Sequence, residues 1–127
     1  MKEKQEQPTI LVIDDDSHIL SLLETYLSKK GVKTYTSSSA KEALGILRTS
    51  QIKLALVDIC MPDVNGVDLL QQIQKITPST HVIMITGLGD MEVAKKCMQL
   101  GAKDFITKPF DFEYLETSIL AELIPLS

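Results

Sequence analysis

The chain has 127 residues, 44% of them hydrophobic, which suits a single domain with one continuous core. Its formal net charge of −4 argues against a surface that holds a nucleic-acid backbone by itself, because such a surface needs a concentration of Lys and Arg. No apolar run approaches the roughly 18 residues of a membrane helix, and the polar N-terminus has no apolar signal core, so we expect a cytoplasmic protein without membrane contact.

Five segments predict β-strands, taken in chain order. Residues 9–13, 53–57, 81–85 and 104–107 are continuous runs rich in β-branched residues, which is typical of strands buried on both faces. Residues 32–36 alternate between polar and apolar side chains instead, and this alternation predicts a strand at the edge of a sheet.

Segments with helical periodicity lie between and after these strands. The first spans residues 19–27 and is followed by Gly31, placed to end it. Ser39 and Glu42 form a capping-box pattern that opens the second helix. Three more helices are predicted at residues 66–76, at residues 91–100 before Gly101, and from Asp111 to a stop near Pro125.

Strand and helix therefore alternate five times, which predicts an α/β fold. We expect a doubly wound, five-stranded parallel sheet with helices on both faces and right-handed crossovers. The domain should span residues 9–123. We expect residues 1–8 to be a flexible tail, and residues 124–127 to be a second tail or the start of a linker.

Polar residues follow four of the predicted strands. Parallel strands present their carboxyl ends at one edge of the sheet, where doubly wound folds bind ligands. Clustered carboxylates repel one another unless a cation lies among them, and Mg²⁺ prefers such oxygen ligands. A hydroxyl and an ammonium beside them suit an incoming phosphoryl group. The residues are Asp14, Asp15 and Asp16 after the first strand, Asp58 after the third, Thr86 after the fourth and Lys108 after the fifth.

Each of these residues also has an ordinary structural interpretation. Asp after a strand is commonly a turn or helix cap, and we assign Asp16 to that role. Cys60 and Cys97 lie far apart without metal-binding spacing, so we interpret them as reduced thiols. His18 and His81 have no evident partner, and isolated histidines rarely hold a metal.

Four segments together resemble the receiver domain of two-component response regulators, across nearly all of residues 9–123. The resemblance implies a (βα)5 flavodoxin-like fold that acts as a phosphorylation switch rather than as an enzyme with a separate substrate. Residues 85–90 and 108–111 are most similar to receivers of the nitrogen-regulation type. The segments are Ile10-Leu-Val-Ile-Asp-Asp-Asp16, Leu56-Val-Asp-Ile-Cys-Met-Pro-Asp-Val-Asn-Gly66, Ile83-Met-Ile-Thr-Gly87 and Gly101-Ala-Lys-Asp-Phe-Ile-Thr-Lys-Pro-Phe110.

The resemblance assigns a role to each site residue. Asp58 would accept a phosphoryl group from a sensor histidine kinase, and the domain would catalyse only its own phosphorylation and dephosphorylation. Mg²⁺, or Mn²⁺ in its place, would be held by Asp58, by Asp15 directly, by Asp14 through water and by the backbone carbonyl of Cys60. Thr86 and Lys108 would bind the phosphoryl oxygens.

The resemblance also implies how the signal leaves the site. Thr86 and Phe105 would move together after phosphorylation and reshape the face of the fourth helix, fifth strand and fifth helix. Many family members carry Tyr where this chain has Phe105, so the hydroxyl of that relay is missing here. The peptide bond between Lys108 and Pro109 would be cis. The changed face would control an output domain or a downstream protein, or form a homodimer, and the chain is either a free-standing receiver or a fragment.

Two other interpretations use the same residues. The first is a pseudo-receiver, a binding module of the same fold that is not phosphorylated; such domains typically lose the acceptor, the acidic pair or the lysine, all of which this chain keeps. The second is an aspartate-nucleophile phosphatase, because Asp14-x-Asp16 is similar to the DxD motif of haloacid-dehalogenase-like enzymes. That interpretation requires aspartates other than Asp58.

Overall fold

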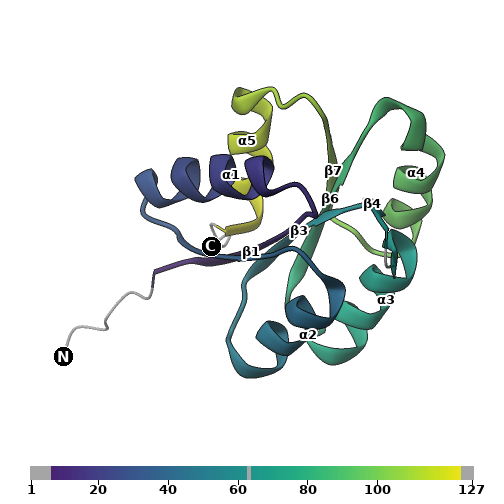
Figure 1. The fold of residues 1–127 in the computed structure, drawn as a ribbon, viewed down its shortest axis with the longest axis horizontal. Helices are drawn as coiled ribbons and strands as arrows, with labels where there is room; N and C mark the ends of the chain where they lie inside the picture. The colour runs from purple at the N-terminus through teal and green to yellow at the C-terminus, as the bar shows by residue number, and fades with distance from the viewer. Residues whose placement is uncertain (1–6, 63, 124–127) are drawn as a thin grey trace.

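A computed structural model describes residues 7–62 and 64–123 (Figure 1). Its centre is a five-stranded parallel sheet in the order β2-β1-β3-β6-β7. The predicted doubly wound sheet is therefore confirmed. The strands are β1 (Thr9–Ile13), β2 (Lys33–Ser37), β3 (Leu54–Asp58), β6 (His81–Thr86) and β7 (Asp104–Thr107).

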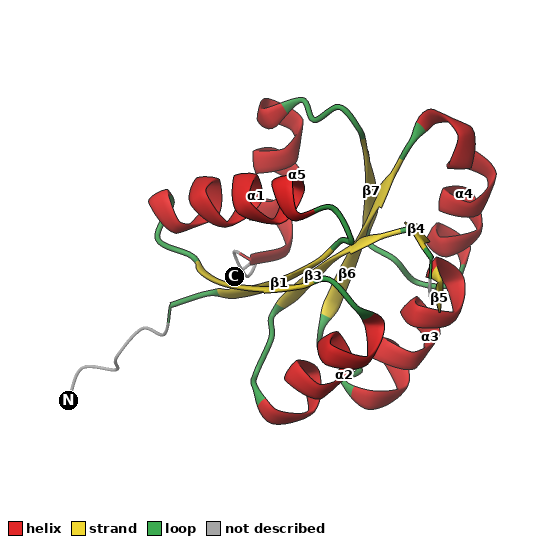
Figure 2. Cartoon of the chain, in the orientation of Figure 1, coloured by secondary structure: helices red, strands yellow, loops and turns green. Residues whose placement is uncertain are grey.

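Five α-helices cover the two faces of this sheet within the described residues (Figure 2). One face packs against α1 and α5, and the other packs against α2, α3 and α4. Side chains along β1 alternate between these two faces. Ile10 and Val12 pack on the face of α1 and α5, while Leu11 and Ile13 pack on the face of α2, α3 and α4. The helices are α1 (Ser17–Lys29), α2 (Ala40–Thr49), α3 (Gly66–Ile76), α4 (Met91–Gln99) and α5 (Phe112–Leu123).

The structure corrects the prediction at four short elements. Strand β7 was expected to be buried on both faces, but only Ile106 is buried, because β7 lies at the edge of the sheet. A two-stranded hairpin of β4 (Cys60–Met61) and β5 (Val64–Asn65) was not predicted, and neither was the 3₁₀ helix η1 (Leu88–Asp90). Elements of two or three residues are too short to show a periodic pattern.

Local signals at the helix ends are mostly as expected. Asp16 and Asp111 accept hydrogen bonds from backbone N–H groups of the first turns of α1 and α5. The capping box of α2 is only half formed: Ser39 Oγ accepts from Glu42 N, but the Glu42 carboxylate accepts from Ser37 Oγ, so the predicted reciprocal bond to Ser39 N is wrong. Gly31 adopts a φ of 82°, a conformation that favours glycine.

The predicted tails fall mainly on residues 1–6 and 124–127, which lie outside the described residues. Gln7 and Pro8 are attached to the domain instead, since Gln7 Nε2 donates to Gly31 O at 3.0 Å and Lys33 N donates to Pro8 O at 2.9 Å. Among the described helices, none is long and apolar enough to cross a membrane.

Candidate functional site

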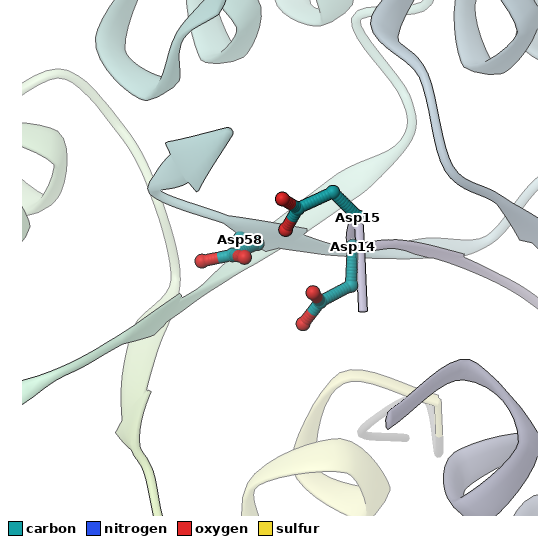
Figure 3. Close-up of side chains that lie close together, drawn as sticks. All are labelled: Asp14, Asp15 and Asp58. Carbon is teal, nitrogen blue, oxygen red and sulfur yellow. The ribbon is translucent and has the colours of Figure 1, made fainter. Parts of the chain in front are cut away.

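The candidate site lies at the carboxyl ends of β1 and β3, the two strands between which the strand order reverses. Asp14 and Asp15 directly follow β1, and Asp58 is the last residue of β3. Figure 3 shows that the three side chains lie close together at these two strand ends. This is the place where a doubly wound sheet leaves a crevice for a ligand.

The three carboxylates can share one ion. Asp14, Asp15 and Asp58 each offer an oxygen, and these oxygens lie within 4.8 Å of one another. Asp14 and Asp58 are buried, whereas Asp15 is exposed. Backbone amides fix the two buried groups: Asp16 N donates to Asp14 Oδ1 at 2.9 Å, and Cys60 N donates to Asp58 Oδ1 at 3.1 Å.

Lys108 brings a positive charge to the same site from the end of β7. Its Nζ lies 3.0 Å from Asp14 Oδ2 and 3.5 Å from Asp58 Oδ2. The backbone N–H of Lys108 donates to Thr86 O at 2.8 Å, and the peptide bond between Lys108 and Pro109 is cis. The lysine therefore bridges the two buried carboxylates.

The carboxylates perturb one another. Burial raises the pKa of Asp58 to about 6, and the nearby charge of Asp14 adds to this, while the Cys60 amide and Lys108 oppose it. Burial lowers the pKa of Lys108, but the Asp14 and Asp58 carboxylates outweigh that effect, so its net pKa is raised and Lys108 stays charged at neutral pH. The site thus holds more negative charge than its one lysine offsets.

A hard divalent cation fits these donors. Asp14 Oδ2 is buried and accepts no well-aligned hydrogen bond from the described residues, although Lys108 Nζ is 3.0 Å away. A buried carboxylate oxygen without a well-aligned hydrogen bond suits a metal ion, because a metal ion does not need a donor at a particular angle. The all-oxygen donor set is the one that Mg²⁺ and Mn²⁺ favour.

Thr86 lies at the end of β6, and Phe105 lies on β7, the next strand of the sheet. Thr86 ends β6, is fully buried, and its Oγ1 donates to Gly87 O at 2.9 Å. Phe105 is half-buried on β7, where it packs against the core on the face of α2, α3 and α4. The hydroxyl and the ring therefore belong to adjacent strands, β6 and β7, that pair residue by residue.

The partner of Cys60 could not be predicted from the sequence. Its exposed thiol donates to Asp90 Oδ2 at 3.2 Å, a residue 30 positions further along the chain in η1. This hydrogen bond and burial raise the pKa of Cys60, with smaller additions from the charges of Asp90 and Asp58, so the thiol stays protonated and remains a donor. Cys97 is buried and unpaired, as expected for a reduced thiol.

The expectation that His81 has no partner is wrong. His81 Nδ1 lies 2.7 Å from Glu122 Oε1, which links the start of β6 to the end of α5. His18 is exposed on α1, as expected for a surface residue. Neither histidine belongs to the candidate site.

Comparison with known proteins gives one family. A sequence model of the family described as the response regulator receiver domain matches residues 10–120. Response regulator protein PilR of Pseudomonas aeruginosa is 37% identical over 113 residues, which are 89% of this chain and 25% of PilR. Transcriptional regulatory protein MalR of Bacillus subtilis is 35% identical over 116 residues, which are 87% of this chain and 48% of MalR. The chain spans about a quarter to a half of the length of these relatives.

Solved structures agree with this likeness. A response regulator receiver domain protein from Clostridium thermocellum superposes with a TM-score of 0.86 at 36% identity, covering 91% of this chain and 94% of that one. The receiver domain of NtrX from Brucella abortus gives a TM-score of 0.85 at 35% identity, covering 90% of this chain and 97% of that one. Both structures share the fold across nearly the whole described domain.

Proposed function

This chain belongs to the response regulator receiver domains, and on that premise we propose that Asp58 accepts a phosphoryl group from the phosphohistidine of a sensor histidine kinase. One observation carries the proposal: Lys108 Nζ lies 3.5 Å from Asp58 Oδ2, within a group of three carboxylates at the sheet's crevice. An Asp58 oxygen would form a bond to phosphorus while the phosphorus–nitrogen bond breaks and its electron pair returns to the imidazole. We propose a cytoplasmic location for this exchange.

The side chains around Asp58 divide the work of the transfer. Mg²⁺ or Mn²⁺ would be held by Asp15 directly, by Asp14 through water, by Asp58 and by the Cys60 carbonyl. When bound, the ion offsets the negative charge of the phosphoryl oxygens. Asp58 attacks as the carboxylate, and a cation beside it would lower its raised pKa and so favour that form. Lys108 remains protonated and binds a phosphoryl oxygen as a fixed positive charge.

We propose that Thr86 and Phe105 carry the signal away from Asp58. The Thr86 hydroxyl now donates to Gly87 O, so binding a phosphoryl oxygen requires it to turn toward the site. That turn would leave room for the ring of Phe105, which lies half-buried on β7, the strand next to β6. The face of α4, β7 and α5 would then control an output domain or a downstream protein, or pair two copies of the chain. The likeness to NtrX supports a receiver of the nitrogen-regulation type.

The test is intact-mass analysis after incubation with acetyl phosphate and Mg²⁺. The natural chain should gain one phosphoryl mass, and Asp58→Asn should gain none. The matched control is Asp16→Asn, since Asn keeps the N-cap of α1 and leaves the cluster intact. A natural chain without added mass, or an Asp58→Asn chain that gains as much, would contradict the proposal.

The same variants separate the two other interpretations. A pseudo-receiver would gain no phosphoryl mass in any form. An aspartate-nucleophile phosphatase would need Asp14 and Asp16, but Asp16 caps α1 through its Oδ1, which accepts from His18 N at 2.9 Å. Phosphorylation that persists in Asp16→Asn and disappears in Asp58→Asn therefore excludes both.

A further inference from the structure

Four of the five described α-helices begin with a side chain that caps their first turn. Asp16, Ser39 and Asn65 have extended backbones, with ψ angles of 110°, 150° and 131°, and each side chain accepts from a backbone N–H two or three residues later. Asp111 caps α5 in the same way, accepting from Glu113 N at 3.0 Å and from Tyr114 N at 3.3 Å. Capping of this kind satisfies N–H groups that have no partner inside the helix.

Helix α4 is the exception. Asp90 stands at its N-cap position and has a favourable side chain for capping, but it makes no capping hydrogen bond. Its φ of −114° and ψ of 21° continue the 3₁₀ helix η1 instead of taking the extended conformation of the other caps. The carboxylate instead accepts the hydrogen bond of the Cys60 thiol at 3.2 Å. The Asp90 carboxylate can thus accept either from backbone N–H groups of α4 or from the Cys60 thiol, and it accepts from the thiol, which is the weaker donor.

Cys60 joins this carboxylate to the phosphoacceptor. Its backbone N–H donates to Asp58 Oδ1 at 3.1 Å, while its thiol donates to Asp90 Oδ2. A phosphoryl group brings a charge of about −1.5 to −2 at neutral pH. On Asp58, that charge would develop next to the residue that holds the Asp90 carboxylate, and like charges repel.

The other end of α4 is fixed. Gln74 Nε2, on α3, donates to Leu100 O at 2.8 Å, just beyond the last residue of α4. Leu100 N and Ala102 N bond to the last carbonyls of the helix as well. A change at Asp90 would therefore act on the N-terminal end of α4 alone.

Resting on the proposed function, we propose that Asp90 is a positioning residue with two states: Cys60 holds it away from α4 before phosphorylation, and phosphorylation of Asp58 releases it to cap α4. Release would unwind η1, extend the backbone at Asp90 and satisfy the N–H groups of Glu92 and Val93. This route reaches α4 without the Thr86 and Phe105 relay. It would order the N-terminal end of α4 in the phosphorylated state.

The first experiment uses the unphosphorylated chain. Amide exchange of Glu92 and Val93 with solvent is measured by NMR in the natural chain, in Cys60→Ala and in Cys60→Ser. Without the thiol, Asp90 should cap α4, and exchange at these amides should slow about fivefold, the effect of an N-cap of ordinary strength. The serine hydroxyl still donates, so Cys60→Ser should exchange as the natural chain does. Unchanged exchange in Cys60→Ala, or equal slowing in both variants, would overturn the inference.

The second experiment adds acetyl phosphate and Mg²⁺, with intact mass as the measure of phosphorylation. The natural chain should show slower exchange at the same two amides, and Asp90→Ala should gain the phosphoryl mass without that slowing. Phosphoryl mass without slower exchange in the natural chain would overturn this inference and leave the proposed function standing. No phosphoryl mass on the natural chain would overturn both.

Discussion

The two ends of the central sheet hold polar side chains in opposite circumstances. At the carboxyl end, Asp14, Asp15 and Asp58 share one space, and Asp14 Oδ2 has no well-aligned hydrogen bond among the described residues (Figure 3). At the other end, Thr80 Oγ1 donates to Ile52 O at 2.7 Å, and His81 pairs with Glu122. The first end keeps groups that cost stability, and the second end uses its polar groups to hold the domain together. The costly end is the one where we propose the phosphoryl transfer.

The largest effect should come from removing the Asp58 charge without Mg²⁺. In EDTA at pH 8, Asp58→Asn should raise the free energy of unfolding by on the order of 3 kcal/mol, because the ionised carboxylate is held where its pKa is raised from 3.8 to about 6. Urea denaturation measures the gain. Asp16→Asn is the matched control, since Asp16 is exposed and its cap is retained, and it should change little.

The pH dependence of that gain checks its cause. A folded-state pKa above the unfolded value means that the native chain binds the proton more tightly. The proton on Asp58 therefore stabilises the natural chain below a pH of about 4, and this stabilisation is lost as the pH rises through about 6. Asp58→Asn lacks this group, so the two chains should differ little at low pH and fully above pH 7. An equal gain at pH 4 and pH 8 would show that charge is not responsible.

The same contrast explains what could be predicted from the sequence. The bounds of β1 and α3 were predicted to the residue, because an apolar run and a helical stripe of apolar residues are local signals. The group of Asp14, Asp58 and Lys108 was predicted as well, because parallel strands bring their carboxyl ends to one edge. The costly end was thus visible in the sequence through topology alone.

The pairings between distant side chains were not predictable. Cys60 and Asp90 are 30 residues apart, and His81 and Glu122 are 41 apart; each pair meets only because of how loops and helices pack. Asp90 even carries the local signature of a cap, and a tertiary hydrogen bond overrides it. Local pattern identifies which groups are available, whereas packing decides which partner each one takes.

A moderate effect is expected at the opposite end of the sheet. Thr80→Val should lower the free energy of unfolding by about 1–2 kcal/mol, because it leaves the Ile52 carbonyl without the hydroxyl that donates to it. Urea denaturation measures the loss, and Ser79→Ala, on the exposed neighbour, is the control. Mg²⁺ titration of Thr80→Val should match the natural chain. A change in Mg²⁺ affinity would mean that the two ends are coupled.

The smallest effect is expected from the pair of His81 and Glu122. The two side chains are 37% and 19% exposed, so solvent screens the attraction that exists when His81 is protonated, and Glu122→Gln should lower the free energy of unfolding by about 0.5 kcal/mol at low salt and pH 5. The loss should shrink in 1 M salt, where the Debye length is only about 3 Å. The control is Glu24→Gln on the exposed surface of α1, which should not lower the free energy of unfolding. A loss as large as that of Thr80→Val would instead show that solvent screens this pair far less than the exposure of its side chains implies.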